Sequence, residues 1–174
     1  MRRLIATLLA SAFALGVHAA DFRVRVDGGH GRLPQSSSFH GFGCTGANRA
    51  PAVRWSQAPA GTRSYALTVY DPDAPTGSGW WHWVVVNLPV SSTALPAGGR
   101  LPAGALAVRN DYGQAAWGGP CPPEGDAPHR YVFTVYALDV PALELPDGAS
   151  PALAGFMIHG HTLGKAQATL TYGR

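Results

Sequence analysis

The sequence predicts a mainly β fold, and its composition gives the reasons. Of 174 residues, 22 are Gly and 15 are Pro, whereas only 13% are charged, against roughly 25% in an average soluble domain. Gly and Pro disfavour helix interiors, so this content argues against a helical bundle or a coiled coil. Hydrophobic residues make up 46% of the chain and aromatic residues 10%, which is enough apolar surface to offset the entropy of ordering the chain. We therefore expect one folded, loop-rich β domain.

Residues 1–19 have the pattern of a secretory signal peptide. Two arginines near the start precede an apolar run from Leu4 to Val17, and small residues at Val17 and Ala19 suit a cleavage site. The run is shorter than the roughly 20 residues that a transmembrane helix needs. We expect cleavage, a single domain over residues 20–174, and export to the periplasm or outside the cell without a transmembrane segment.

Five segments have the composition of β-strands. They are rich in β-branched and aromatic residues and are bounded by Gly, Pro, Asp or Ser, as strands commonly are. The run of three valines in the third segment predicts burial on both faces of a sheet. In chain order the expected strands are Phe22–Val26, Ser64–Tyr70, Trp80–Leu88, Arg130–Leu138 and Gln167–Tyr172.

One short helix is predicted between Gly148 and Met157. Ser150 is a good N-cap, and Pro151 suits the first turn of a helix. The helix is expected to pack on the sheet through one apolar side formed by Leu153, Phe156 and Met157.

The charge of the chain gives no indication of nucleic-acid binding. Cleavage after Ala19 removes two of the 13 basic residues and none of the ten acidic ones, so the formal net charge falls from +3 to +1. Lys165 is the one lysine, and the arginines are scattered along the chain. No basic run is present that would neutralise many phosphates.

Cys44 and Cys121 are far apart in the sequence and form no CxxC motif or zinc-like spacing. In an exported protein such a pair indicates a disulfide rather than a metal or redox site. The alternative is two thiols that are buried separately.

Polar residues at strand ends point to a binding site. Asp71 follows one predicted strand, while His82 and His129 lie at the starts of two others. The end of one strand lies beside the start of its antiparallel neighbour, so these side chains are expected to converge at one rim of the sheet, with Tyr131 on the same face as His129.

The chemistry of this group favours a small anion. Two imidazoles and a phenol offer hydrogen bonds to phosphate oxygens, and protonation of a histidine would strengthen them. The Asp71 carboxylate would orient a histidine or meet a cationic part of the ligand, so a zwitterionic headgroup suits the whole set. The alternative is that His82 and His129 are merely hydrogen-bonded, partly buried residues.

Two motifs resemble one known family. The segment Asp71–Asn87, which reads DPDAPTGSGWWHWVVVN, is similar to the signature of the phosphatidylethanolamine-binding proteins, the family of the Raf kinase inhibitor protein, and looks most like its bacterial branch. Gly118–Pro120 followed by His129–Tyr131 resembles the second motif of that family. The likeness extends from about Leu33 to Tyr172.

The resemblance implies antiparallel sheets with Greek-key connections, one or two short helices, and a small pocket for phosphate-bearing ligands or phospholipid headgroups such as phosphoethanolamine. It also implies a cis bond between Ala74 and Pro75 and a position for both cysteine segments at the border of the pocket. It implies no catalytic residue, no cofactor and no metal. Carried over by position, the ligand-binding residues are Asp71, His82, His129 and Tyr131, with walls from Pro72, Pro75, Trp80, Gly119 and Pro120.

One departure from the family concerns partners. Mammalian members continue into a C-terminal helix beside the pocket, whereas here only Gly173 and Arg174 follow the last expected strand. A kinase-inhibitor role is therefore not expected. A protein–protein role, as inhibitor or modulator of a protease or signalling enzyme, stays open as the main alternative to ligand binding.

The sequence disfavours two enzyme classes. Two histidines and a carboxylate suit a divalent metal, and His159 and His161 form a further pair, but no HExxH or other metal spacing is present. A serine hydrolase needs an activated nucleophile, and no GxSxG motif is present; Ser78 reads better as a turn residue. We expect an exported, non-enzymatic binding protein.

Overall fold

The computed structural model describes residues 21–174, so the predicted signal peptide lies outside the described residues. The α-helix is α1 (Pro151–Gly160), and a short 3-10 helix covers Gln35–Ser37. The strands are β1 (Arg23–Val26), β2 (His40–Gly41), β3 (Cys44–Thr45), β4 (Val53–Ser56), β5 (Ser64–Asp71), β6 (Trp80–Pro89), β7 (Ala94–Leu95), β8 (Leu106–Val108), β9 (His129–Leu138) and β10 (Thr162–Tyr172).

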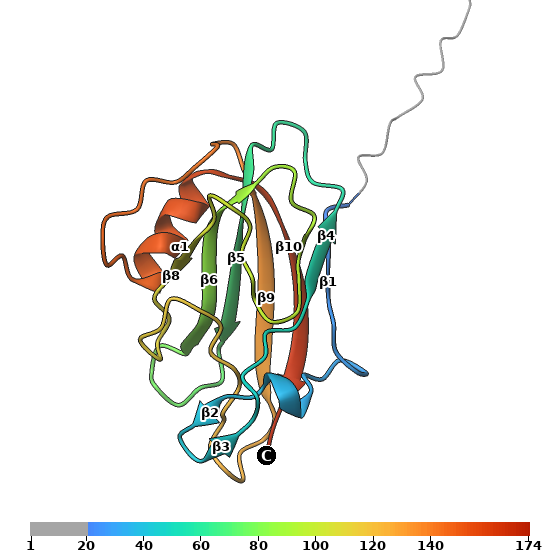
Figure 1. The fold of residues 1–174 in the computed structure, drawn as a ribbon, viewed down its shortest axis with the longest axis vertical. Coiled ribbons are helices and arrows are strands. Elements are labelled where there is room, and N and C mark those ends of the chain that lie inside the picture. Colours follow the sequence, from blue (N-terminus) through green and yellow to red (C-terminus); the bar gives the residue numbers. More distant parts are fainter. Residues whose placement is uncertain (1–20) are drawn as a thin grey trace, which may run out of the picture.

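The main sheet has five strands in the order β10-β9-β5-β6-β8, and every neighbouring pair is antiparallel. Strands β5, β6 and β8 follow one another across the sheet, and β9 returns to lie beside β5 (Figure 1). This order is that of a Greek key, in which the fourth strand pairs with the first. The predicted mainly β fold with antiparallel sheets is confirmed.

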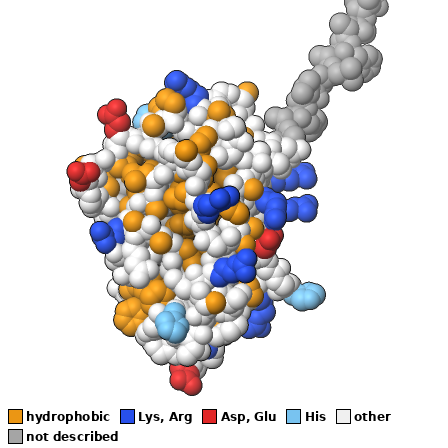
Figure 2. Space-filling model, viewed as in Figure 1, with side chains coloured by type: hydrophobic (Ala, Val, Ile, Leu, Met, Phe, Trp, Pro, Cys, Tyr) orange, Lys and Arg blue, Asp and Glu red, His pale blue; other side chains and the backbone are white. Residues whose placement is uncertain are grey.

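A smaller sheet, in the order β1-β4-β7, packs against one face of the main sheet. Strand β4 alternates, so that Val53 and Trp55 are buried while Arg54 and Ser56 are exposed. The buried pair joins a core with the β6 residue Trp83 and its neighbours. The outer face of the small sheet is polar, and Figure 2 shows basic side chains on the side of the molecule where β1 and β4 lie.

Helix α1 covers the opposite face of the main sheet (Figure 1). The N-cap prediction is confirmed, because the Ser150 hydroxyl accepts a hydrogen bond from the Leu153 amide. The predicted apolar side is right for Met157, which is partly buried and packs against the core, and wrong for Leu153 and Phe156, which are exposed. The buried positions of the helix are Ala154 and Ile158. The small Ala154 allows the helix to approach the sheet closely, and Ile158 follows one turn later on the same face.

The central strands agree with the sequence prediction, and the outer ones differ. The three valines of β6 are fully buried, as expected for a strand covered on both faces. Strand β10 begins at Thr162, five residues before the predicted start, with a register shift between Thr162 and Gly164. The short strands β2, β3, β4, β7 and β8 were not predicted, and all of them except β4 have only two or three residues, which are too few for a periodic pattern.

The strand ends of interest meet at one end of the main sheet. Strand β5 ends there, β6 and β9 begin there, and the β2–β3 hairpin lies at the same end (Figure 1). In residues 21–174 no helix has the length and hydropathy of a membrane span.

Candidate functional site

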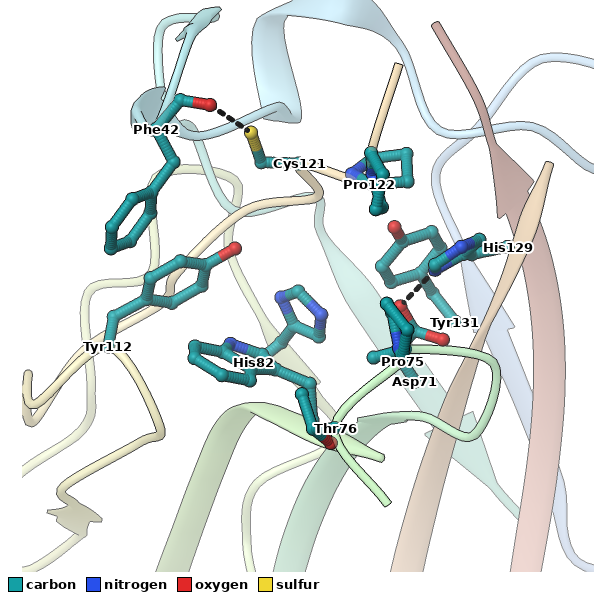
Figure 3. A pocket seen from close by; sticks show the side chains of 13 residues that line it. Phe42, Asp71, Pro75, Thr76, His82, Tyr112, Cys121, Pro122, His129 and Tyr131 are labelled. Carbon is teal, nitrogen blue, oxygen red and sulfur yellow. Dashed lines mark hydrogen bonds and ion pairs between the residues drawn. The ribbon is translucent and has the colours of Figure 1, made fainter. Parts of the chain in front are cut away.

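A cavity of about 220 Å³ lies at this end of the sheet (Figure 3). Asp71, the last residue of β5, pairs with Trp80, the first residue of β6. His82 follows on the same face of β6, and His129 and Tyr131 share a face at the start of β9. The residues that line the cavity are Phe42, Asp71, Ala74, Pro75, Thr76, Trp80, His82, Tyr112, Cys121, Pro122, Pro123, His129 and Tyr131.

Six of the nine predicted ligand-binding residues line this cavity, and Pro72, Gly119 and Pro120 do not. Pro72 is exposed on the outer side of the loop after β5. Gly119 and Pro120 are buried behind the wall, where the Gly119 carbonyl accepts a hydrogen bond from the Tyr112 hydroxyl. A Cβ at Gly119 would lie 2.0 Å from the Ser37 carbonyl oxygen, so only glycine allows this close approach.

The ring of His82 is held in one tautomer. Its Nδ1 lies 2.7 Å from the Gly118 carbonyl oxygen, which only accepts hydrogen bonds, so Nδ1 carries the proton. Burial lowers the pKa of His82 to about 4, although the bond to Gly118 opposes this shift. The ring is therefore neutral near pH 7, and its Nε2 presents a lone pair.

His129 is held differently, between two carboxylates. Its Nδ1 lies 2.8 Å from Oδ2 of Asp71, and both side chains are buried. Oδ1 of Asp71 accepts a hydrogen bond from the Asp73 amide at 2.8 Å. Both oxygens of Asp71 thus have partners within the protein, which assigns to this carboxylate the task of orienting His129. On the other side of the ring, Nε2 lies 3.4 Å from Oδ2 of Asp126, whose side chain is partly exposed.

Three polar atoms on cavity residues have no hydrogen-bond partner within residues 21–174. They are Nε1 of Trp80, Nε2 of His82 and the hydroxyl of Tyr131, and all three are buried. Burial raises the pKa of Tyr131, so its hydroxyl stays protonated. Buried polar atoms in native proteins nearly always have a partner. Two donors, on Trp80 and Tyr131, and one acceptor, on His82, thus lack a partner on residues that line the cavity.

The loop after β5 is fixed to β9 by an ion pair. The Asp73 carboxylate accepts hydrogen bonds from the backbone amide and the guanidinium of Arg130, at distances down to 2.6 Å. These bonds lower the pKa of Asp73 to about 2. The predicted cis bond before Pro75 is wrong, because the peptide bonds of the described residues are all trans. The Thr76 amide donates to the Ala74 carbonyl, and this bond closes the turn in the trans form.

The predicted disulfide is present between Cys44 and Cys121. Cys44 begins β3, and Cys121 lines the cavity. The bond thus connects the β2–β3 hairpin to the segment that forms one wall of the cavity.

Several lining residues were missed from the sequence. Phe42, Tyr112, Pro122 and Pro123 lie in loops, where no periodicity assigns a side chain to a face. A signal for Phe42 was available, since a large apolar residue between two glycines is unusual for a solvated turn.

The histidines outside the cavity have other surroundings. Nδ1 of His161 lies 3.0 Å from Oδ1 of Asp139, and His159 is exposed. Within residues 21–174 no three His, Cys, Asp or Glu side chains are grouped as metal ligands.

The chain is similar to known proteins over most of its length. A model of the family described as phosphatidylethanolamine-binding protein matches residues 28–173. Escherichia coli YbcL is 44% identical, with 99% of this chain and 98% of YbcL aligned. Escherichia coli YbhB is 47% identical over 81% of this chain and 92% of its own. A Mycobacterium tuberculosis protein named as a lipoprotein, LppC, is 43% identical over 75% of this chain and 63% of its own.

The fold is also similar to that of a solved structure. The crystal structure of E. coli YbcL, described as a new member of the mammalian PEBP family, has a TM-score of 0.85 and 47% identity, and the match covers 89% of this chain and 99% of that one. The family match, the identities and the shared fold agree. The chain belongs to the phosphatidylethanolamine-binding protein family.

Proposed function

We propose that the protein is an exported, non-enzymatic binding protein whose cavity holds the phosphate group of a small molecule or of a phospholipid headgroup. The observation that carries this proposal is the set of buried atoms without partners on Trp80, His82 and Tyr131. A phosphate group is small enough for the cavity of about 220 Å³ and has oxygens for all three atoms. Membership of a family named for binding a phospholipid supports the same class of ligand.

The neutral ring of His82 selects the protonation state of the ligand. Its Nε2 accepts a hydrogen bond, so the phosphate must supply one proton, while its other oxygens accept bonds from Trp80 and Tyr131. Inorganic phosphate and a free headgroup such as phosphoethanolamine can supply that proton, whereas the diester of an intact phospholipid cannot. Phosphomonoesters carry such a proton below their second pKa of about 6, whereas inorganic phosphate keeps one as its hydrogen phosphate dianion above neutral pH. Affinity for a phosphomonoester such as phosphoethanolamine should therefore rise as the pH falls through about 6, because the complex retains a proton that the free ester loses above that pH.

A carboxylate next to the cavity residue His129 suits an amine on the ligand. Asp126 lies beside His129, with its carboxylate partly exposed. An ammonium group attached to the phosphate would form a charge-assisted hydrogen bond with this carboxylate. Phosphoethanolamine has both groups.

Export and the absence of catalysis are parts of the same proposal. The basic and apolar start of the chain supports export, as does the relative named as a lipoprotein. A hydrolase pairs its nucleophile with a histidine base, whereas here the hydroxyls of the cavity residues Thr76 and Tyr112 donate to the backbone carbonyls of Gly79 and Gly119.

Calorimetric titration with inorganic phosphate and with phosphoethanolamine tests the proposal. Tyr131→Phe removes one donor and keeps the ring, so phosphate affinity should fall about tenfold, as expected for loss of a hydrogen bond to a charged group. His82→Asn keeps a donor for the Gly118 carbonyl and removes the acceptor, and it should have a similar effect. The control His159→Ala alters an exposed histidine on α1 and should bind as the wild type does.

Absence of heat with both ligands in the wild type would contradict the proposal. Equal affinities for the wild type, Tyr131→Phe and His82→Asn would contradict it as well, because binding would then occur elsewhere.

A further inference from the structure

Phe42 is an exposed aromatic residue at the mouth of the cavity. Its side chain is 75% exposed, although it lines the same cavity as His82. It lies at the tip of the β2–β3 hairpin, which the disulfide of Cys44 ties to the cavity wall. An exposed large apolar side chain on a constrained hairpin has no role in the core.

The backbone at Phe42 is also in an unfavourable conformation. Its φ of +49° lies in the left-handed region, which a residue with a Cβ adopts at a cost and which glycine adopts freely. Glycine occupies the positions on both sides, Gly41 and Gly43. Both exposure and strain would be relieved by glycine or asparagine at this tip. Strained backbone near a cavity points to a function of the side chain.

Phe42 extends a set of nearly parallel aromatic rings toward the cavity. The rings of Phe39 and Tyr112 stack with centroids 4.0 Å apart, and Phe42 lies 5.8 Å from Tyr112 at an interplanar angle of 27°. Tyr112 in turn lies 5.8 Å from the ring of His82. A group attached to a phosphate at His82 thus reaches Tyr112 first and Phe42 next.

The opposite side of the cavity is formed by proline rings. Figure 3 shows Phe42 and Tyr112 on one side of the cavity, Pro75 and Pro122 on the other, and His82 at the base between them. Flat aromatic faces opposite proline rings favour a flat apolar group between them. The Asp126 carboxylate, proposed above to bind an amine, lies beside His129.

We propose that Phe42 and Tyr112 form a binding surface for an aromatic ring, so that the preferred ligands are phosphomonoesters of aromatic alcohols. This inference rests on the proposed function, because the phosphate must lie at His82 to bring the ring against Tyr112. Phe42 is then a residue that determines specificity. It does not contribute to phosphate binding itself.

The test compares inorganic phosphate, phenyl phosphate and cyclohexyl phosphate by calorimetry. Phenyl phosphate should bind the wild type about tenfold more tightly than inorganic phosphate, because a flat ring buries apolar area and stacks. Cyclohexyl phosphate has a ring of similar size without a flat face, so its affinity should lie between the two. Phe42→Ala should remove most of the gain for phenyl phosphate and leave the affinity for inorganic phosphate unchanged.

Two further variants separate binding from folding. Phe42→Asn places a residue that tolerates the left-handed conformation at this position, so the unfolding temperature should not fall. The preference for phenyl phosphate should nevertheless be lost, because the aromatic ring is gone. Phe156→Ala removes a phenylalanine of equal exposure, 74%, from α1 and should leave all three affinities unchanged.

The experiment distinguishes failure of the proposed function from failure of the proposed role of Phe42. If neither inorganic phosphate nor any of the phosphomonoesters binds, the proposed function is wrong. If inorganic phosphate binds but phenyl phosphate binds no more tightly, or if Phe42→Ala keeps the preference, only the role of Phe42 is wrong. Equal affinities for phenyl and cyclohexyl phosphate would overturn the preference for an aromatic ring.

Discussion

His82 and His129 are buried at the same end of the main sheet, but their surroundings give them different tasks. His82 donates from Nδ1 to a carbonyl and has a free lone pair at Nε2. His129 has a carboxylate on each side, from Asp71 and Asp126. The first ring is available to a ligand, whereas the second completes a polar wall. The type of residue predicts neither task, since both depend on the atoms that contact each ring.

The buried neutral ring of His82 makes stability depend on pH. Its pKa is about 4 in the folded protein, against 6.5 ordinarily. Between these values the unfolded chain binds a proton that the folded protein does not, so the free energy of unfolding should be highest above pH 6.5 and fall as the pH decreases to 4. The loss should approach about 3 kcal/mol.

Urea denaturation at several pH values measures this loss. In His82→Asn the free energy of unfolding should vary less with pH over the same range, because the titrating ring is gone while the donor to Gly118 is kept. An equal pH dependence in both proteins would show that other groups cause it.

The loop after β5 is the element that carries one wall of the cavity, and its position depends on Asp73 and Arg130. Asp73→Asn should lower the free energy of unfolding by less than about 1 kcal/mol, because the pair is largely exposed to solvent. Phosphate affinity should fall as well, since Pro75 and Thr76 lose the contact that fixes their loop. The contribution of the Asp73 carboxylate is present above its ordinary pKa of 3.8 and is lost as the pH falls through about 2.

Asp27→Asn provides the matched control for this loop. Asp27 forms an exposed ion pair with Arg54 on the small sheet, at 2.5 Å, so its loss should leave phosphate affinity unchanged. If both variants alter phosphate affinity equally, or neither does, the loop is not positioned by Asp73.

The elements differ in how well the sequence predicts them. Strands β5, β6 and β9 are long and apolar, and their ends bring together the predicted residues Asp71 and His82. The face of α1 was only partly predicted because close packing favours the small Ala154 over larger apolar residues. The loop residues of the cavity, Phe42 above all, were missed because their positions depend on turns and on the disulfide.

At the scale of the whole molecule, the disulfide between Cys44 and Cys121 links distant parts of the chain. It joins residues 77 positions apart, and closing so long a loop restricts the unfolded chain. The double variant Cys44→Ala/Cys121→Ala should therefore lose about 2 to 5 kcal/mol of unfolding free energy. Urea denaturation of the variant and of the oxidised wild type measures the difference. Identical midpoints would contradict this account.

The central claim is that a phosphate group binds at Nε2 of His82. Long-range proton–nitrogen NMR spectra of ¹⁵N-labelled protein, recorded during titration with inorganic phosphate near pH 6, test it most directly. The Nε2 signal of His82 should shift as that atom gains a hydrogen bond, its Nδ1 should stay protonated, and the signals of the exposed His159 should not move. Saturable phosphate binding without any change at His82 would contradict the claim.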